Sequence, residues 1–146
     1  MGGQRMRTGR NGINLIKSFE GLRLRAYKCP AGVWTIGYGH TAGVRAGDVI
    51  EEQKAEQLLV EDLVEFERVV NRECPGLRQN QFDALVSFAF NVGTGNFLRS
   101  TLLKCVKANP ENVNIRYELS RWNKAGGMIL SGLIRRRKAE ADLYFS

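Results

Sequence analysis

Residues 19–41 read FEGLRLRAYKCPAGVWTIGYGHT, and this stretch holds both the end of a helix and the start of a sheet. Apolar residues recur at helical spacing after Asn11, a plausible N-cap, and Gly21 supplies a stop directly after Glu20. From residue 24 onward, β-branched and aromatic residues alternate with glycines, a pattern typical of a small antiparallel sheet with tight turns. The stretch therefore predicts a helix that ends in a carboxylate and leads directly into a hairpin.

The rest of the chain has a helical apolar pattern. Residues 51–73 predict a long amphipathic helix that ends at Cys74-Pro75-Gly76, and further helices are expected near 80–92, 97–108, 111–123 and 133–145. The length of 146 residues and a hydrophobic content of 43% favour one domain. We expect an α+β fold with two lobes and a cleft between them. Its parts are a flexible leader (1–10) and one domain (11–146), comprising a sheet lobe (about 20–50), a connecting helix (about 51–73) and a helical lobe (about 77–146).

Charge and cysteine content narrow the class of protein. The formal net charge is +7 and the pI is about 9.7, which favours binding to polyanions such as peptidoglycan or nucleic acid. No nucleic-acid motif is recognised, and no segment has the run of about 18 apolar residues that a membrane span needs. The three cysteines, an odd number, argue against a disulfide framework and against a zinc site, and they fit synthesis in a reducing cytoplasm.

One spacing carries a specific resemblance. Glu20 is followed after eight residues by Cys29 and after five more by Thr35, which opens a Thr-Ile-Gly-x-Gly-His run that ends at His40. This arrangement resembles the catalytic signature of phage-type lysozymes, the endolysins of the T4-lysozyme family. Later segments resemble other landmarks of that family: Asn91-Val92-Gly93, the run from Phe97 to Leu102, Arg121-Trp122, and Leu133-Ile134-Arg135-Arg136-Arg137 with Glu140.

The resemblance implies a two-lobed lysozyme-like fold and a muramidase that cleaves the β-1,4 bond between N-acetylmuramic acid and N-acetylglucosamine, lysing the bacterial host. Glu20 is the candidate acid, because partial burial beside Ile16 favours the protonated carboxyl that must give a proton to the departing oxygen. Cys29 stands where most relatives have Asp. With Thr35 it could orient an attacking water, as the inverting mechanism of the family implies, or it could act as a thiolate nucleophile.

Other residues are expected to support the site or bind substrate. The only histidine, His40, is expected to form a structural ion pair with Asp62, which lies near the apolar stripe of the long helix. Arg137 follows Ile134 by three residues, so we expect it to reach inward to Glu20. The candidate substrate-binding residues are Gly39, Trp34, Asn91, Ser100 and Arg116.

Two alternatives remain open from the residues alone: a peptidase that uses Cys29 and His40 on peptide cross-links, and a basic module that binds the wall without catalysis. The leading interpretation has peptidoglycan as its partner and involves no metal, cofactor, nucleic acid or stable membrane anchor. It predicts a monomer that is made in the host cytoplasm, leaves through a holin pore and acts on the cell wall in the periplasm.

Overall fold

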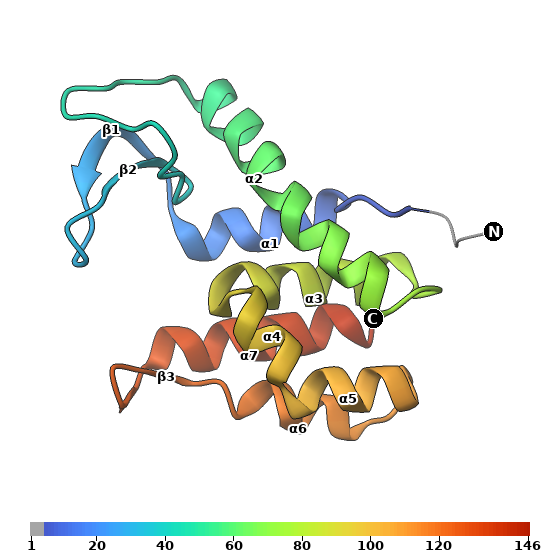
Figure 1. Ribbon diagram of the computed structural model, residues 1–146. Coiled ribbons are helices and arrows are strands. Elements are labelled where there is room, and N and C mark those ends of the chain that lie inside the picture. Colours follow the sequence, from blue (N-terminus) through green and yellow to red (C-terminus); the bar gives the residue numbers. More distant parts are fainter. Residues whose placement is uncertain (1–4) are drawn as a thin grey trace.

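The computed structural model describes residues 5–146 and has a hairpin-bearing part and a helical part (Figure 1). The first part contains α1 (Arg10–Glu20), the strands β1 (Arg23–Lys28) and β2 (Trp34–Gly37), and the long helix α2 (Glu52–Glu73), which runs from the hairpin toward the helical part. The remaining elements are α3 (Gln79–Val92), α4 (Thr94–Arg99), α5 (Thr101–Ala108), α6 (Asn114–Ser120), β3 (Lys124–Ala125), β4 (Met128–Ile129) and α7 (Ser131–Tyr144). The predicted α+β class is confirmed, with the expected order of a small sheet, a long helix and a helical part.

Both ends of α1 are fixed by specific contacts. The helix begins after Gly9, two residues before the predicted cap Asn11, because the buried carboxylate of Asp83 on α3 accepts hydrogen bonds from the backbone N–H groups of Gly9 (3.0 Å) and Gly12 (3.1 Å). A carboxylate at this position satisfies orphan donors of the first turn. At the other end Gly21 has a φ of 74°, which favours glycine, and it stops the helix directly after Glu20.

The hairpin follows as predicted from the glycine and β-branched pattern. β1 and β2 are antiparallel, with Tyr27 opposite Thr35 and Lys28 opposite Trp34. The backbone then turns back on β2, because the N–H of Ile36 donates to the carbonyl of His40 and the N–H of His40 donates to Ile36, both at 2.9 Å. This turn places Gly39 and His40 next to the strand that carries Thr35.

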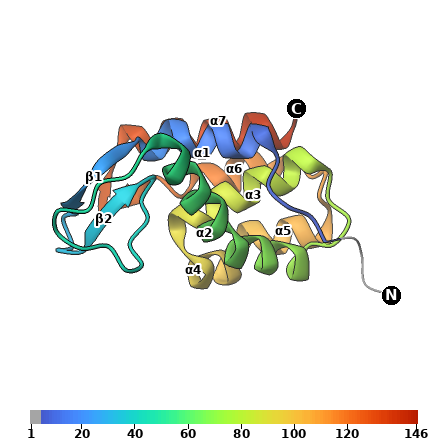
Figure 2. The same cartoon turned by 90° about the horizontal axis from the view of Figure 1, so that it is seen from above.

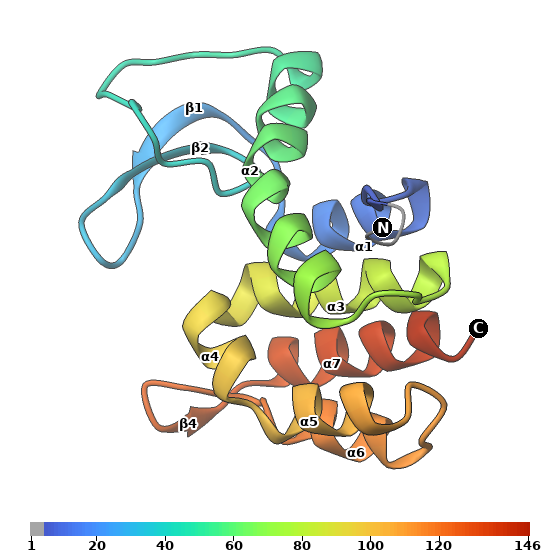
Figure 3. The same cartoon turned by 45° about the vertical axis from the view of Figure 1, so that its right-hand side comes forward.

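The helical part is built around α3. Every residue from Gln81 to Ala89 is buried, and α3 contacts α1, α2, α4 and α7 (Figure 3). Seen from above, α1 overlaps α7 and α3 lies to one side of them (Figure 2), and each of these three helices contacts the other two. This arrangement brings the C-terminal end of α1 into reach of side chains on α7, although their sequence positions are more than a hundred residues apart.

Two helices and one hairpin differ from the sequence-based expectation. The helix predicted over 97–108 is divided at Ser100, whose hydroxyl accepts from the N–H of Leu103 and begins a new helix. The helix predicted over 111–123 is limited to α6. The small hairpin formed by β3 and β4 was not predicted, because its two-residue strands show no alternation and its turn is formed by Gly126 and Gly127.

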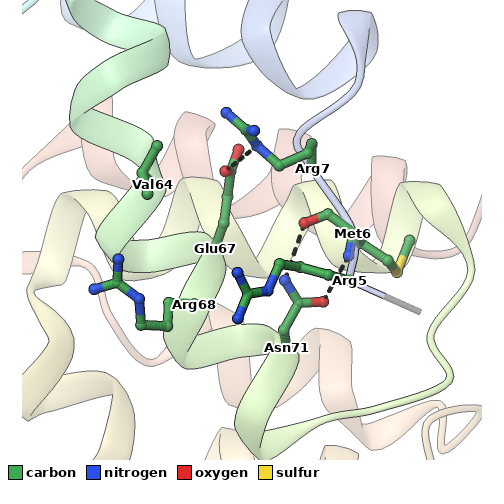
Figure 4. A pocket seen from close by; sticks show the side chains of 7 residues that line it. All are labelled: Arg5, Met6, Arg7, Val64, Glu67, Arg68 and Asn71. Carbon is green, nitrogen blue, oxygen red and sulfur yellow. Dashed lines mark hydrogen bonds and ion pairs between the residues drawn. The ribbon is translucent and has the colours of Figure 1, made fainter. Parts of the chain in front are cut away.

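The segment before α1 is held against α2 (Figure 4). Asn71 accepts from the N–H of Met6 (3.0 Å) and donates to its carbonyl (2.9 Å). The buried carboxylate of Glu67 accepts from Arg7 Nε and from both the N–H and the hydroxyl of Thr8. The predicted flexible leader is therefore wrong for residues 6–10, because their backbone polar groups find partners on α2 and α3, and residues 1–4 lie outside the described part.

Candidate active site

Glu20 lies at the C-terminal end of α1 in a groove that α3 and α7 complete. The side chain is 22% exposed, so it is half sheltered and still open to a ligand. The groove is lined by Ser18, Phe19, Glu20, Asn91, the segment Leu130–Leu133, Arg135 and Arg136. Asn91, a predicted substrate-binding residue, therefore shares this groove with the predicted acid.

Gly39 forms the wall beside Glu20 on the sheet side. A Cβ atom placed at position 39 would lie 3.3 Å from Glu20 Oε1, and the φ of 88° also favours glycine. A side chain here would crowd the carboxylate. The role predicted for Gly39 as a substrate-binding residue is untested, but the structure brings its backbone directly beside the acid.

The basic residue that contacts Glu20 is Arg136. Its Nη1 donates to Glu20 Oε2 at 2.7 Å, and its side chain is almost fully buried. The predicted contact from Arg137 is wrong. It was placed by its spacing from Ile134, but Ile134 is 48% exposed, and the buried face of α7 instead carries Arg136, Arg137 and Glu140. Apolar periodicity cannot locate a buried face that consists largely of charged residues.

Glu140 joins the two buried arginines. It is fully buried and accepts hydrogen bonds from Arg137 Nη1 (2.8 Å), Arg136 Nε (3.3 Å) and the hydroxyl of Ser87 (2.6 Å). Burial raises the pKa of Glu140, while the charges of Arg137 and Arg136 lower it. Arg136 is thus held between two carboxylates, one at the groove and one in the core. Its Nη2 also donates to Ser87.

Sequence reasoning did not identify Glu140 and Ser87 as partners of these arginines. One signal was available, because Glu140 follows Arg136 by four residues and Arg137 by three, the two spacings at which helical side chains meet. Ser87 gave no signal, since the contact joins two helices distant in sequence.

Cys29 and Thr35 lie at the turn end of the hairpin, where residues 29–33 connect β1 to β2. The N–H of Cys29 donates to the carbonyl of Val33 (2.9 Å), and the hydroxyl of Thr35 donates to the same carbonyl (3.0 Å). Hydrogen bonds from the backbone of Val33 and Ala31 lower the pKa of the Cys29 thiol. The thiol of Cys29 therefore gives up its proton more readily than an ordinary cysteine does.

The two groups of candidate catalytic residues are connected by one turn. Thr35 precedes Ile36, whose backbone is bridged to His40, and Gly39 within this turn lies beside Glu20, since a Cβ atom placed on it would be 3.3 Å from Glu20 Oε1. The hairpin is thus anchored next to the end of α1. The structure describes no direct hydrogen bond between Glu20 and either Cys29 or Thr35 within residues 5–146.

The predicted pairing of His40 and Asp62 is present. His40 Nδ1 lies 2.8 Å from Asp62 Oδ2, and His40 Nε2 lies 2.9 Å from the carbonyl of Ala42. The contact joins the turn after β2 to α2. Because both ring nitrogens have partners, His40 is not placed to act as a base for Cys29.

The other candidate substrate-binding residues lie outside the groove of Glu20. Trp34, in β2, has the ammonium of Lys28 5.5 Å from its ring centroid. The hydroxyl of Ser100 is buried and is occupied as a helix cap, since it also donates to the carbonyl of Phe97. Arg116 pairs with Asp142 on the outer face of α7. The structure therefore gives the hydroxyl of Ser100 a structural contact and leaves the ligand roles of the other two untested.

The fold and the site together define a class of protein. A carboxyl group is sheltered at the junction of a small hairpin-bearing part and a helical part, and it lies in an open groove with an oriented cation behind it. This is the arrangement of a lysozyme-type glycoside hydrolase.

The chain belongs to the phage lysozyme family, whose model matches residues 17–140. It is 42% identical to an endolysin of Acyrthosiphon pisum secondary endosymbiont phage 1, over 97% of this chain and 99% of that protein. It is 46% identical to an endolysin of Bacillus phage B103, of which it spans only 55%. Among solved structures, the muramidase domain of SpmX from Asticaccaulis excentricus matches with a TM-score of 0.90 and 40% identity, covering 97% of this chain and 99% of that one.

The chain is accordingly an enzyme, a muramidase that acts on peptidoglycan. The comparisons support neither the Cys29–His40 peptidase nor the non-catalytic wall-binding module. Within the described residues, no helix combines the length and apolar content that crossing a membrane requires.

Proposed function

We propose that Glu20, Cys29 and Thr35 hydrolyse the β-1,4 bond between N-acetylmuramic acid and N-acetylglucosamine with inversion at the anomeric carbon. The observation that carries this proposal is the placement of Glu20 in the groove, with one carboxyl oxygen bound to Arg136 and the other beside Gly39. The roles of the three residues are inferred from this geometry and from the chemistry of glycoside hydrolysis.

The contacts of Glu20 indicate which oxygen delivers the proton. A guanidinium group has only donors, so Oε2, which accepts from Arg136, cannot carry the proton while that hydrogen bond is kept. The proton is therefore expected on Oε1, which faces Gly39 and the hairpin. From there it passes to the departing sugar oxygen as the glycosidic bond breaks.

The water is held by the hairpin. The hydroxyl of Thr35 donates its hydrogen bond to the carbonyl of Val33, so the hydroxyl oxygen can still accept a hydrogen bond from water. The lowered pKa of Cys29 favours the thiolate, which accepts a proton from the water as the water oxygen bonds to the anomeric carbon. Glu20 gives one proton and Cys29 receives one.

The test counts new reducing sugar ends and new free amines released from purified peptidoglycan. Wild type is expected to produce reducing ends only. Glu20→Gln, which has no acidic proton, is expected to lose activity by about two or more orders of magnitude, and Cys29→Asp is expected to keep substantial activity. The proposal fails if Glu20→Gln retains near wild-type activity, or if a correctly folded Cys29→Asp is completely inactive.

We also propose that the protein is a monomer, is made in the host cytoplasm and reaches the wall through a holin pore. The three unpaired cysteines, Cys29, Cys74 and Cys105, support synthesis in a reducing compartment. Co-expression with a holin is expected to lyse the host, whereas this chain expressed alone is expected to leave the cells intact. Lysis at equal rates with and without the holin would contradict the proposed route, and a dimer in light scattering would contradict the monomer.

A further inference from the structure

Arg137 is held in the core and has one contact at the groove. Its side chain is 1% exposed, Nη1 donates to Glu140 Oε1 at 2.8 Å, and the guanidinium lies 5.0 Å from the centroid of the Phe88 ring. Its Nη2 donates to Oδ1 of Asn91, the residue that lines the groove beside Glu20. Arg137 therefore links the buried network to the ligand-binding surface.

This contact fixes the orientation of the Asn91 amide. The guanidinium group has no acceptor, so the side of Asn91 that faces it must be the carbonyl oxygen. The opposite side, Nδ2, is then a donor, and no residue in the described part of the chain accepts a hydrogen bond from it. Asn91 thus presents a donor, Nδ2, on the side away from Arg137, while its oxygen is held by the guanidinium.

We propose that Asn91 Nδ2 donates a hydrogen bond to the acetamido carbonyl oxygen of an N-acetylhexosamine in the groove, and that Arg137 is the positioning residue that orients this amide. A hydroxyl group can donate or accept and so adapts to either orientation of an amide, whereas a carbonyl oxygen only accepts. A fixed orientation of the Asn91 amide therefore matters most when the ligand group that it binds is a carbonyl oxygen. This inference rests on the proposed function, because it requires the glycan to lie beside Glu20.

The contact is tested by matching variants of Asn91 to substrates with and without the acetyl group. In Asn91→Asp the carboxylate still accepts from Arg137 but offers no donor. On N-acetylated glycan its kcat/KM is expected to fall about 10- to 100-fold, the range for a site group left without its hydrogen bond. On chemically de-N-acetylated glycan, wild type and variant are expected to differ less than threefold. Asn96→Asp introduces the same charge on α4, outside the groove, and is expected to match wild type on both substrates.

Arg137→Lys tests the positioning role through the same selectivity. A lysine keeps a cation beside Glu140 but cannot hold both that carboxylate and the Asn91 amide in the geometry of a guanidinium. The preference for N-acetylated over de-N-acetylated glycan is expected to fall toward that of Asn91→Asp. An unchanged preference, in a variant that folds, would show that Arg137 is purely structural.

A binding measurement separates this inference from the catalytic proposal and covers the case of undetectably slow turnover. In the Glu20→Gln background, calorimetry with soluble glycan chains is expected to show weaker binding of N-acetylated chains when Asn91→Asp is added, and no such weakening for de-N-acetylated chains. If the weakening persists without acetyl groups, or disappears only when the stem peptides are removed, the acetamido assignment is overturned. Activity retained by Glu20→Gln would instead refute the catalytic proposal.

Discussion

Replacing Glu140 with Gln measures how strongly the buried charges of α7 depend on one another. The substitution preserves size but removes the carboxylate that contacts both Arg136 and Arg137 in the core. Gln can still accept one hydrogen bond from Arg137 through its oxygen. Its amide nitrogen, however, would face the Nε donor of Arg136.

The expected cost follows from these contacts. Breaking a buried ion pair by removing one partner costs about 3–5 kcal/mol, because the remaining charge is left buried without compensation. For a domain of this size each kcal/mol corresponds to about 2–4 °C, so the melting temperature is expected to fall by roughly 6–20 °C. Urea unfolding followed by circular dichroism gives the free energy directly.

Asp142→Asn is the matched control on the same helix. Asp142 also contacts two cations, Arg116 at 2.8 Å and Lys138 at 3.2 Å, but its side chain is 51% exposed. The loss of these solvated pairs is expected to cost less than about 1 kcal/mol. If Glu140→Gln and Asp142→Asn destabilise the protein equally, the reasoning about the buried network is wrong.

Three further predictions follow from individual contacts. Backbone hydrogen bonds lower the pKa of Cys29, so its alkylation by iodoacetamide, followed by peptide mass spectrometry, should reach half its maximal rate at a lower pH than the alkylation of glutathione does. Burial raises the pKa of Cys74 to about 11, so Cys74 should stay unreactive in the folded protein. Equal pH profiles for Cys29 and glutathione would refute this prediction. Gly39→Ala and Gly43→Ala both place a side chain at positive φ and should each cost about 1–2 kcal/mol in thermal unfolding. Only Gly39→Ala should also lower kcat, since only its Cβ would meet the carboxylate of Glu20, the proposed acid; equal kcat values would count against that role. Hydrogen bonds from basic side chains hold the pKa of Glu56 below its ordinary value of 4.5. The contribution of Glu56 to stability is therefore present above pH 4.5 and is lost as the pH falls through the lowered pKa of the folded protein. Glu56→Gln should reduce the loss of stability on acidification, and an unchanged acid profile in urea unfolding would contradict this.

The sequence predicted those parts of the site that depend on local order along the chain. The end of α1 at Glu20, the hairpin and the turn to His40 all follow from glycine positions and short-range spacing. The contact between His40 and Asp62 was predicted as well, because a carboxylate near a buried stripe requires a partner.

The sequence could not resolve the parts that depend on packing between distant helices. Three adjacent arginines lie within α7, and only the orientation of α7 against α1 and α3 determines that Arg136 reaches Glu20 while Arg137 reaches Asn91. The start of α1 is set in the same way by Asp83, a residue of another helix. Helix propensity contains no information about such partners.

The anomeric configuration of the first product tests the central mechanism most directly. If the hairpin holds a water on the face opposite the departing oxygen, hydrolysis of the β-linked glycan releases the α-anomer, which proton NMR detects before mutarotation. We expect the α-anomer to appear first in wild type and in Cys29→Asp. Initial release of the β-anomer by wild type would contradict direct attack by water and indicate a covalent intermediate.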